Sequence, residues 1–219
     1  MKYKCLVLDH DDTTVNSTAT VHYPSFLNTL KERNMLHLNV TLDDYFALNC
    51  DPGLHAYYRD VVGLNEEEIA QETQDWLAWV STHIPDFFEG MDDIIRKQKE
   101  EGGMIAVVSH SRKENIIRDY QAADLPVPDF IYGSELPKEK VKPSIFPIED
   151  ILSNAKLQRK DLLMVDDLIM GHQMAEKAGI DFVCAAWAHS VPMIEEYFNS
   201  HNVNIFKSPK DLYDYLFAE

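Results

Sequence analysis

Short apolar runs punctuate the chain and carry its first structural signal. Each run is nearly continuous instead of alternating with polar residues, which is typical of strands buried on both faces of a parallel sheet. The four clearest runs lie at residues 4–8, 104–108, 162–165 and 181–186. A weaker run lies at residues 130–132. Apolar residues recur at helical spacing over residues 91–101, 112–122, 145–155 and 171–178. Alternating strands and helices predict an α/β fold with a doubly wound, Rossmann-like parallel sheet.

The interval after the first run breaks this alternation. Residues 16–85 show no pattern of a buried strand and instead resemble amphipathic helices separated by Gly and Pro. We expect these helices at residues 23–33, 42–49, 53–61 and 66–81. The chain should therefore have two domains, an α/β catalytic core of residues 1–15 and 86–219 and an inserted α-helical cap of residues 16–85.

Composition narrows the possible partners and the compartment. The chain has 219 residues, 45% of them hydrophobic, which is enough for a sizeable core. Its 20 Lys and Arg residues against 37 Asp and Glu residues give a net charge of −17, so nucleic acid and anionic membranes are poor partners. The three cysteines show neither a disulfide nor a zinc pattern. We expect a cytoplasmic protein with no nucleic-acid or membrane partner, and the sequence does not reveal its oligomeric state.

Polar residues with catalytic potential follow the apolar runs, at the points where the strands should end. They are Asp9, Asp11, Ser109, Lys142, Asp166 and Asp167. Because the carboxyl ends of parallel strands meet at one edge of a sheet, we expect these side chains to converge. Several converging carboxylates repel one another unless a hard cation lies among them, and Mg²⁺ prefers oxygen ligands of this kind.

This set resembles the motifs of the haloacid dehalogenase-like superfamily. The first motif, a strand followed by DxDGT, corresponds to LDHDDT at residues 8–13. The second ends a strand at Ser109, the third is Lys142 followed by Pro143, and the fourth ends a strand at two acids. The resemblance covers nearly the whole chain. With the helical insertion, the chain resembles members with an α-helical cap, such as phosphoglycolate phosphatases and β-phosphoglucomutases.

The resemblance implies a Mg²⁺-dependent phosphatase that acts on a small phosphorylated metabolite. Asp9 would attack phosphorus and form an aspartyl-phosphate, and Asp11 would serve as general acid and base. Ser109 would bind a phosphate oxygen, and Lys142 would balance the negative charge of Asp9 and the phosphoryl group. Asp9, the backbone carbonyl of Asp11 and Asp167 would bind the metal. Asp166 would contact the metal through a water molecule, or would support the residues that bind the metal directly.

Substrate contacts beyond Ser109 and Lys142 are expected from His110 and from two cap residues, His22 and Arg59. Two alternatives remain open at this stage. A sugar-phosphate mutase would use the same site and differ only in the fate of the aspartyl-phosphate. A non-catalytic binding protein could also retain this scaffold, because fold alone does not secure function.

Two residues depart from the family pattern. Asp12 stands where members usually have glycine, and the backbone there should tolerate Asp if its φ is positive. Gly171 stands four residues beyond Asp167, where many members have another acid. We therefore expect no metal ligand at position 171.

Overall fold

The computed structural model describes residues 2–218. The chain divides into two compact units, one formed by residues 1–16 and 87–219 and the other by residues 17–86. The first is the α/β unit and the second is the helical unit.

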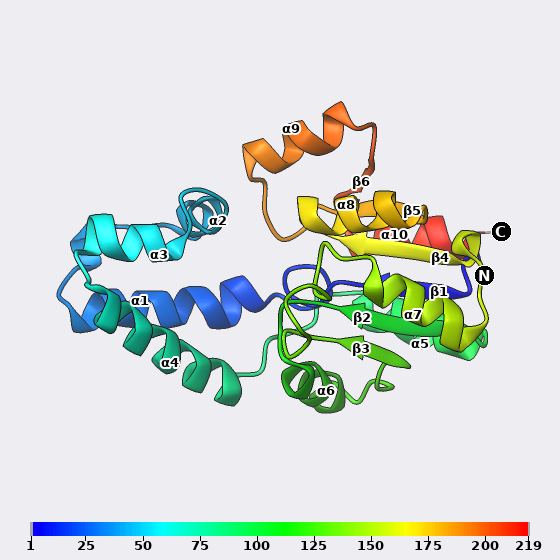
Figure 1. Cartoon of the computed structure of the whole chain (residues 1–219), viewed down its shortest axis with the longest axis horizontal. Coiled ribbons are helices and arrows are strands. Elements are labelled where there is room, and N and C mark those ends of the chain that lie inside the picture. The colour runs from blue at the N-terminus through cyan, green and yellow to red at the C-terminus, as the bar shows by residue number, and fades with distance from the viewer. Residues whose placement is uncertain (1, 219) are drawn as a thin grey trace. The chain divides into compact units, whose positions relative to one another are not determined.

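The α/β unit is built on a sheet in which the described residues form six parallel strands (Figure 1). The strands are β1 (Cys5–Leu8), β2 (Met104–Val108), β3 (Phe130–Tyr132), β4 (Leu162–Asp166), β5 (Asp181–Ala185) and β6 (Asn204–Phe206). Their spatial order is β3-β2-β1-β4-β5-β6. The direction of winding therefore reverses between β1 and β4, and doubly wound sheets bind ligands at such a point. The predicted fold class is confirmed.

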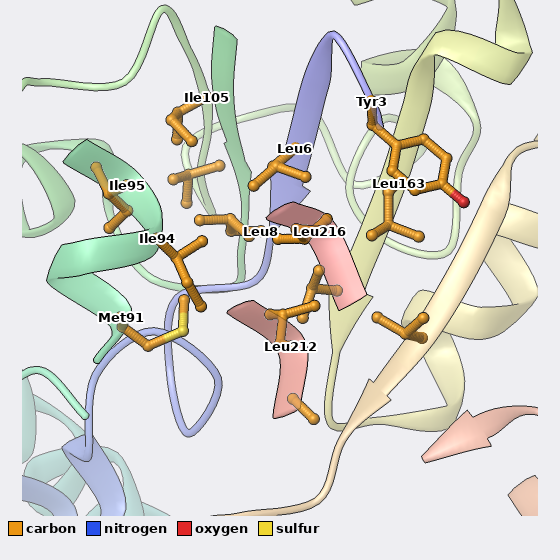
Figure 2. Packing of buried hydrophobic residues seen from close by; sticks show 14 of the residues in the cluster. Tyr3, Leu6, Leu8, Met91, Ile94, Ile95, Ile105, Leu163, Leu212 and Leu216 are labelled. Carbon is orange, nitrogen blue, oxygen red and sulfur yellow. The ribbon is translucent and has the colours of Figure 1, made fainter. Parts of the chain in front are cut away.

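Both faces of the sheet are covered by helices, because each strand places successive side chains on opposite faces. On one face, Leu6 and Leu8 pack with α5 (Met91–Glu100), α6 (Lys113–Ala122) and α10 (Pro209–Phe217). Figure 2 shows this cluster around β1, α5 and α10, with Leu6, Leu8, Met91, Ile94, Leu212 and Leu216 labelled. On the other face, Cys5 and Val7 pack with α7 (Phe146–Ala155) and α8 (Ile169–Ala178). Fully burying one such Leu side chain contributes about 1.5–3 kcal/mol, so β1 is held firmly from both sides.

Most elements lie within two residues of the ranges expected from the sequence. The apolar pattern did not predict β6, α10 or α9 (Pro192–Ser200). Strand β6 has only three residues, exposed or half-buried, so it shows no continuous apolar run. The helix expected at residues 53–61 is instead a short helix α3 (Leu54–Tyr57) followed by a π-helical turn (Tyr58–Val62) that ends at Gly63.

The helical unit has a hydrophobic core of its own. Its main helices are α1 (Tyr23–Glu32), α2 (Leu42–Cys50), α3 and α4 (Glu66–Thr82), with shorter turns at Thr18–His22 and Leu36–Leu38. Phe26 of α1 lies at the centre of this core and packs against the rings of Tyr45, Tyr57 and Tyr58. Capping boxes at Thr41 and Asn65 fix the starts of α2 and α4. Within residues 2–218, none of the helices combines the length and apolar character that a membrane span requires.

Candidate active site

Three carboxylates meet at the carboxyl ends of the two central strands. Asp9 directly follows β1, Asp166 is the last residue of β4, and Asp167 comes next. Strands β1 and β4 are paired with Leu8 opposite Val165, which brings the residues after them to one edge. One carboxylate oxygen from each acid lies within 4.8 Å of the others, and all three side chains are buried. The sheet register therefore unites acids that lie more than 150 residues apart in sequence.

Lys142 lies against this cluster and is itself 5% exposed. Its ammonium group donates to Oδ1 of Asp9 at 2.7 Å and to Oδ2 of Asp166 at 2.8 Å. Burial by itself lowers the pKa of Lys142, but attraction to Asp166 and Asp9 outweighs that effect and the net shift is upward. Lys142 therefore stays protonated and joins Asp9, which follows β1, to Asp166, which ends β4.

The cluster carries more negative charge than Lys142 can balance. Burial, with Asp166 and Asp11 nearby, raises the pKa of Asp9 to about 6 despite the opposing effect of Lys142. Burial and the charge of Asp9 raise the pKa of Asp167 to about 8. Three carboxylates face one ammonium group, so a divalent cation with a preference for oxygen would neutralise the excess. The donor set therefore fits Mg²⁺.

Asp11 has a different set of partners. Its Oδ2 accepts a hydrogen bond of 2.7 Å from the hydroxyl of Ser111 and a longer one of 3.3 Å from the hydroxyl of Ser109. The backbone N–H of Ser111 in turn donates to the Ser109 hydroxyl at 3.0 Å. Ser109 directly follows β2, and its own N–H donates to the carbonyl of Tyr132 in β3. We had not singled out Ser111, although its position two residues beyond Ser109 was a signal available in the sequence.

Asp167 is held through both of its carboxylate oxygens. The hydroxyl of Thr13 donates to Oδ1 at 3.1 Å, and Nε2 of His189 lies 3.0 Å from Oδ2. The indole N–H of Trp187 donates to the backbone carbonyl of Thr13 at 3.1 Å. Burial lowers the pKa of His189, which favours its neutral form. The sequence indicated His189 only as a polar residue shortly after β5, and we assigned it no role.

His10 lies between Asp9 and Asp11 in the sequence, but its side chain contacts neither Lys142 nor the two serines in the hydrogen bonds described. Nε2 of His10 lies 3.0 Å from Oδ2 of Asp119 in α6, and both side chains are buried. Asp119 also accepts a hydrogen bond from Arg118, and the ring of Tyr120 stacks near that of His10. His10 thus attaches the motif loop to α6, while Asp9 contacts Lys142 and Asp11 contacts the two serines.

The remaining candidates differ in their surroundings. His110 has an exposed side chain, and desolvation by its local packing, followed by repulsion from Lys142, lowers its pKa. In the helical unit, the indole N–H of Trp76 donates to Nδ1 of His22 at 3.1 Å. Arg59 is exposed and forms a bidentate pair with Asp60 at 2.7 and 2.8 Å. The proposed substrate contacts of these three residues remain predictions.

Asp12 adopts the backbone conformation on which its tolerance depends. Its φ is 58°, in the left-handed region where glycine is most common and where Asp and Asn are accepted better than most residues. Its N–H donates to the carbonyl of Val15 at 2.8 Å, which closes the tight turn after the motif acids. The substitution of Asp for the family's usual glycine is therefore compatible with the turn.

Comparisons with known proteins agree with this fold. No curated protein sequence matches the chain at a significant level. A predicted phosphoglycolate phosphatase from Haemophilus somnus superimposes with a TM-score of 0.76 and 17% identity over 99% of both chains. A HAD family hydrolase from Deinococcus radiodurans, with bound phosphate and sodium, superimposes with a TM-score of 0.74 and 16% identity. The match covers 98% of this chain and 95% of that one. CbbY from Rhodobacter sphaeroides, in complex with phosphate, superimposes with a TM-score of 0.68 and 17% identity over 96% of both chains.

At such low identities the structural likeness shows the fold alone. The sequence supplies the stronger finding, because a family model described as haloacid dehalogenase-like hydrolase matches residues 6–185. That match includes the segments that carry Asp9, Ser109, Lys142 and Asp167, and it extends over most of the chain. The chain therefore belongs to the haloacid dehalogenase-like hydrolases.

Proposed function

We propose that this hydrolase is a Mg²⁺-dependent phosphatase that releases inorganic phosphate from a small phosphorylated metabolite. One observation carries the proposal. The two acids of the first motif have separate partners, since Asp9 pairs with the Lys142 ammonium group and Asp11 accepts hydrogen bonds from Ser111 and Ser109. Two carboxyl groups in different environments can take different roles, one as nucleophile and one as acid and base.

The chemistry proceeds in two steps. In the first, the Asp9 carboxylate forms a bond to phosphorus as the phosphorus–oxygen bond to the leaving group breaks, and Asp11 protonates the departing oxygen. In the second, Asp11 takes a proton from water, whose oxygen bonds to phosphorus as the bond to Asp9 breaks. The products are an alcohol and inorganic phosphate, with both acids restored to their starting states.

Charge neutralisation is the main requirement for such a transfer. When bound, Mg²⁺ supplies positive charge to the phosphoryl oxygens, and the acids suited to hold it are Asp9 and Asp167, with the Asp11 carbonyl and Asp166 as further candidates. Lys142 supplies a permanent positive charge beside Asp9. Ser109 would bind a phosphate oxygen. The neighbours support a phosphorylated substrate, since structures of CbbY hold phosphate and xylulose-(1,5)-bisphosphate.

Substrate choice is assigned in this proposal to His110 and to the helical unit, which would act as the cap. His22 and Arg59 are the proposed contacts there, and the pairing of Arg59 with Asp60 would have to yield to an anionic substrate group. An exposed ion pair such as Arg59–Asp60 contributes only about 0–1 kcal/mol, so a substrate anion could replace Asp60 at little cost.

The test is phosphate release from a panel of phosphorylated metabolites with and without Mg²⁺. We expect turnover that requires the metal, and we expect Asp9→Asn to lower kcat at least roughly 1,000-fold. The matched control is Asp93→Asn, which changes an exposed acid on α5 and should retain normal turnover. Isomerised substrate without phosphate release would indicate a mutase instead. Full activity in Asp9→Asn would refute the mechanism.

A further inference from the structure

Gly171 is the third residue of α8, and it is buried. A Cβ atom built at this position would lie 2.6 Å from Cβ of Asp166 and would overlap the carboxyl group of the same residue even more closely. The backbone of Gly171 is helical, so the position does not need glycine for its conformation. What it needs is empty space, because the Asp166 side chain already occupies the volume that any other residue would fill.

The carboxylate that uses this space is fixed from two directions. Oδ1 of Asp166 accepts the backbone N–H of Leu168 at 2.9 Å, and Oδ2 accepts the Lys142 ammonium group at 2.8 Å. The Asp166 side chain is fully buried, at 0% exposure. Its orientation is therefore set by the turn into α8 on one side and by Lys142 on the other.

Lys142 depends on this arrangement for its position. A lysine side chain has four flexible carbon–carbon bonds and a compact charge, so a single ion pair leaves its ammonium group free to move. Here the ammonium group contacts Asp9 and Asp166 together, at 2.7 and 2.8 Å. The second contact fixes the ammonium group relative to the first, which is the contact with the proposed nucleophile.

We propose that Asp166 is a positioning residue that holds Lys142 against Asp9, and that position 171 is glycine because it must leave room for Asp166. The catalytic part of this inference rests on the proposed function, whereas the shared space and the pairing with Lys142 do not. This role differs from direct metal ligation, in which the carboxylate of Asp166 would be directed at the cation.

The shared space is tested by thermal unfolding of the full chain. Replacing glycine by alanine inside a helix ordinarily stabilises a protein. We expect Gly171→Ala instead to lower Tm by roughly 5 °C or more, because the methyl group meets Asp166. In an Asp166→Gly background the same change should raise Tm. If Gly171→Ala fails to fold but Asp166→Gly/Gly171→Ala folds, the inference is supported equally. An equal effect of Gly171→Ala in both backgrounds would overturn it.

The link to Lys142 is tested with Asp166→Asn, which keeps the size of the side chain and removes its charge. We expect kcat to fall about tenfold or more while KM changes little, because positioning at the nucleophile is lost and not substrate binding. In a Lys142→Met background, Asp166→Asn should have almost no further effect on kcat, and it should raise Tm instead of lowering it, because it removes a buried charge that has lost its cation. Independent losses in the double variant would overturn the role, as would recovery of Asp166→Asn at high Mg²⁺ concentration.

The Tm measurements also separate this inference from the proposed function. If the unaltered chain hydrolysed no phosphorylated metabolite, the proposed function would fail. Coupling between Asp166 and Lys142, and between Asp166 and Gly171, would still appear in the thermal unfolding of these single and double variants. If neither coupling appeared, the positioning role of Asp166 would be refuted, whatever reaction the chain catalyses.

Discussion

The hydroxyl of Ser111 donates a 2.7 Å hydrogen bond to Oδ2 of Asp11, and it is a shorter contact than the 3.3 Å one from Ser109. Ser111 thus fixes the carboxylate that we propose as the general acid and base. Hydrogen bonds to charged groups contribute about 1.5–3 kcal/mol, whereas a longer contact such as the one from Ser109 contributes less. Of these two hydroxyl groups, Ser111 is therefore the stronger support of Asp11.

Replacing Ser111 by alanine should lower kcat/KM about tenfold, because Asp11 loses its shorter donor and its fixed orientation. Steady-state phosphate release measures the effect. Ser153→Ala, at an exposed position of α7, is the matched control and should leave kcat/KM unchanged. Equal activities of the two variants would show that Ser111 has no part in the reaction.

Replacing Lys142 by methionine should affect both activity and stability. The variant keeps the length of the side chain but leaves Asp9 and Asp166 buried without their shared cation. Breaking a buried ion pair in this way costs about 3–5 kcal/mol, and we expect kcat to fall at least roughly 100-fold. Chemical denaturation and phosphate release measure the two effects. Lys177→Met, at an exposed position of α8, should alter neither.

His189 should tune the metal site without binding the metal itself. Its Nε2 lies 3.0 Å from Oδ2 of Asp167, so His189→Ala removes one of the two contacts that orient this carboxylate. Loss of such a supporting contact typically weakens metal binding about 10–100-fold. Isothermal titration of Mg²⁺ into the full chain measures the change, with His37→Gln, an exposed histidine, as control. Unchanged affinity in His189→Ala would contradict this role.

The metal-free protein should lose stability as pH rises from 5 to 8. Asp9 and Asp167 have pKa values of about 6 and about 8 in the folded chain, against about 3.9 when unfolded. Below about pH 4 both states hold these protons, so the two acids contribute no difference. Above that pH the unfolded chain releases them first, which favours unfolding until the folded pKa is passed.

We expect the free energy of unfolding to decrease by an amount on the order of 5 kcal/mol over this range, since each pKa unit corresponds to about 1.4 kcal/mol. Urea denaturation at fixed ionic strength measures it. Asp167→Asn should flatten the profile, and Mg²⁺ should stabilise the protein more at pH 8 than at pH 5, because protons compete with the metal for the same oxygens. A flat or rising profile in the unaltered, metal-free chain would contradict the prediction.

Much of the architecture could be predicted from the sequence because its signals are local. A strand buried on both faces must be a continuous apolar run, and β1, β2 and β4 each show one. Asp9 comes directly after β1 and Asp167 directly after β4, so parallel pairing of these strands brings the two acids to the same edge of the sheet. Strand β6 gave no such signal, because a short, partly exposed strand does not need apolar residues.

The contacts of the site depended on the tertiary structure. Side chains from Ser111 and His189 reach Asp11 and Asp167 across 100 and 22 residues of sequence, and only the sheet order and the loop paths determine those distances. The same holds for Gly171, which in the sequence is a missing acid and in the structure is the space that Asp166 occupies. By itself the sequence determined the fold and the acids at the strand ends, because apolar periodicity and strand ends are local properties. Packing decided which donor faces each acid, because a side chain's partners depend on residues that are distant along the chain.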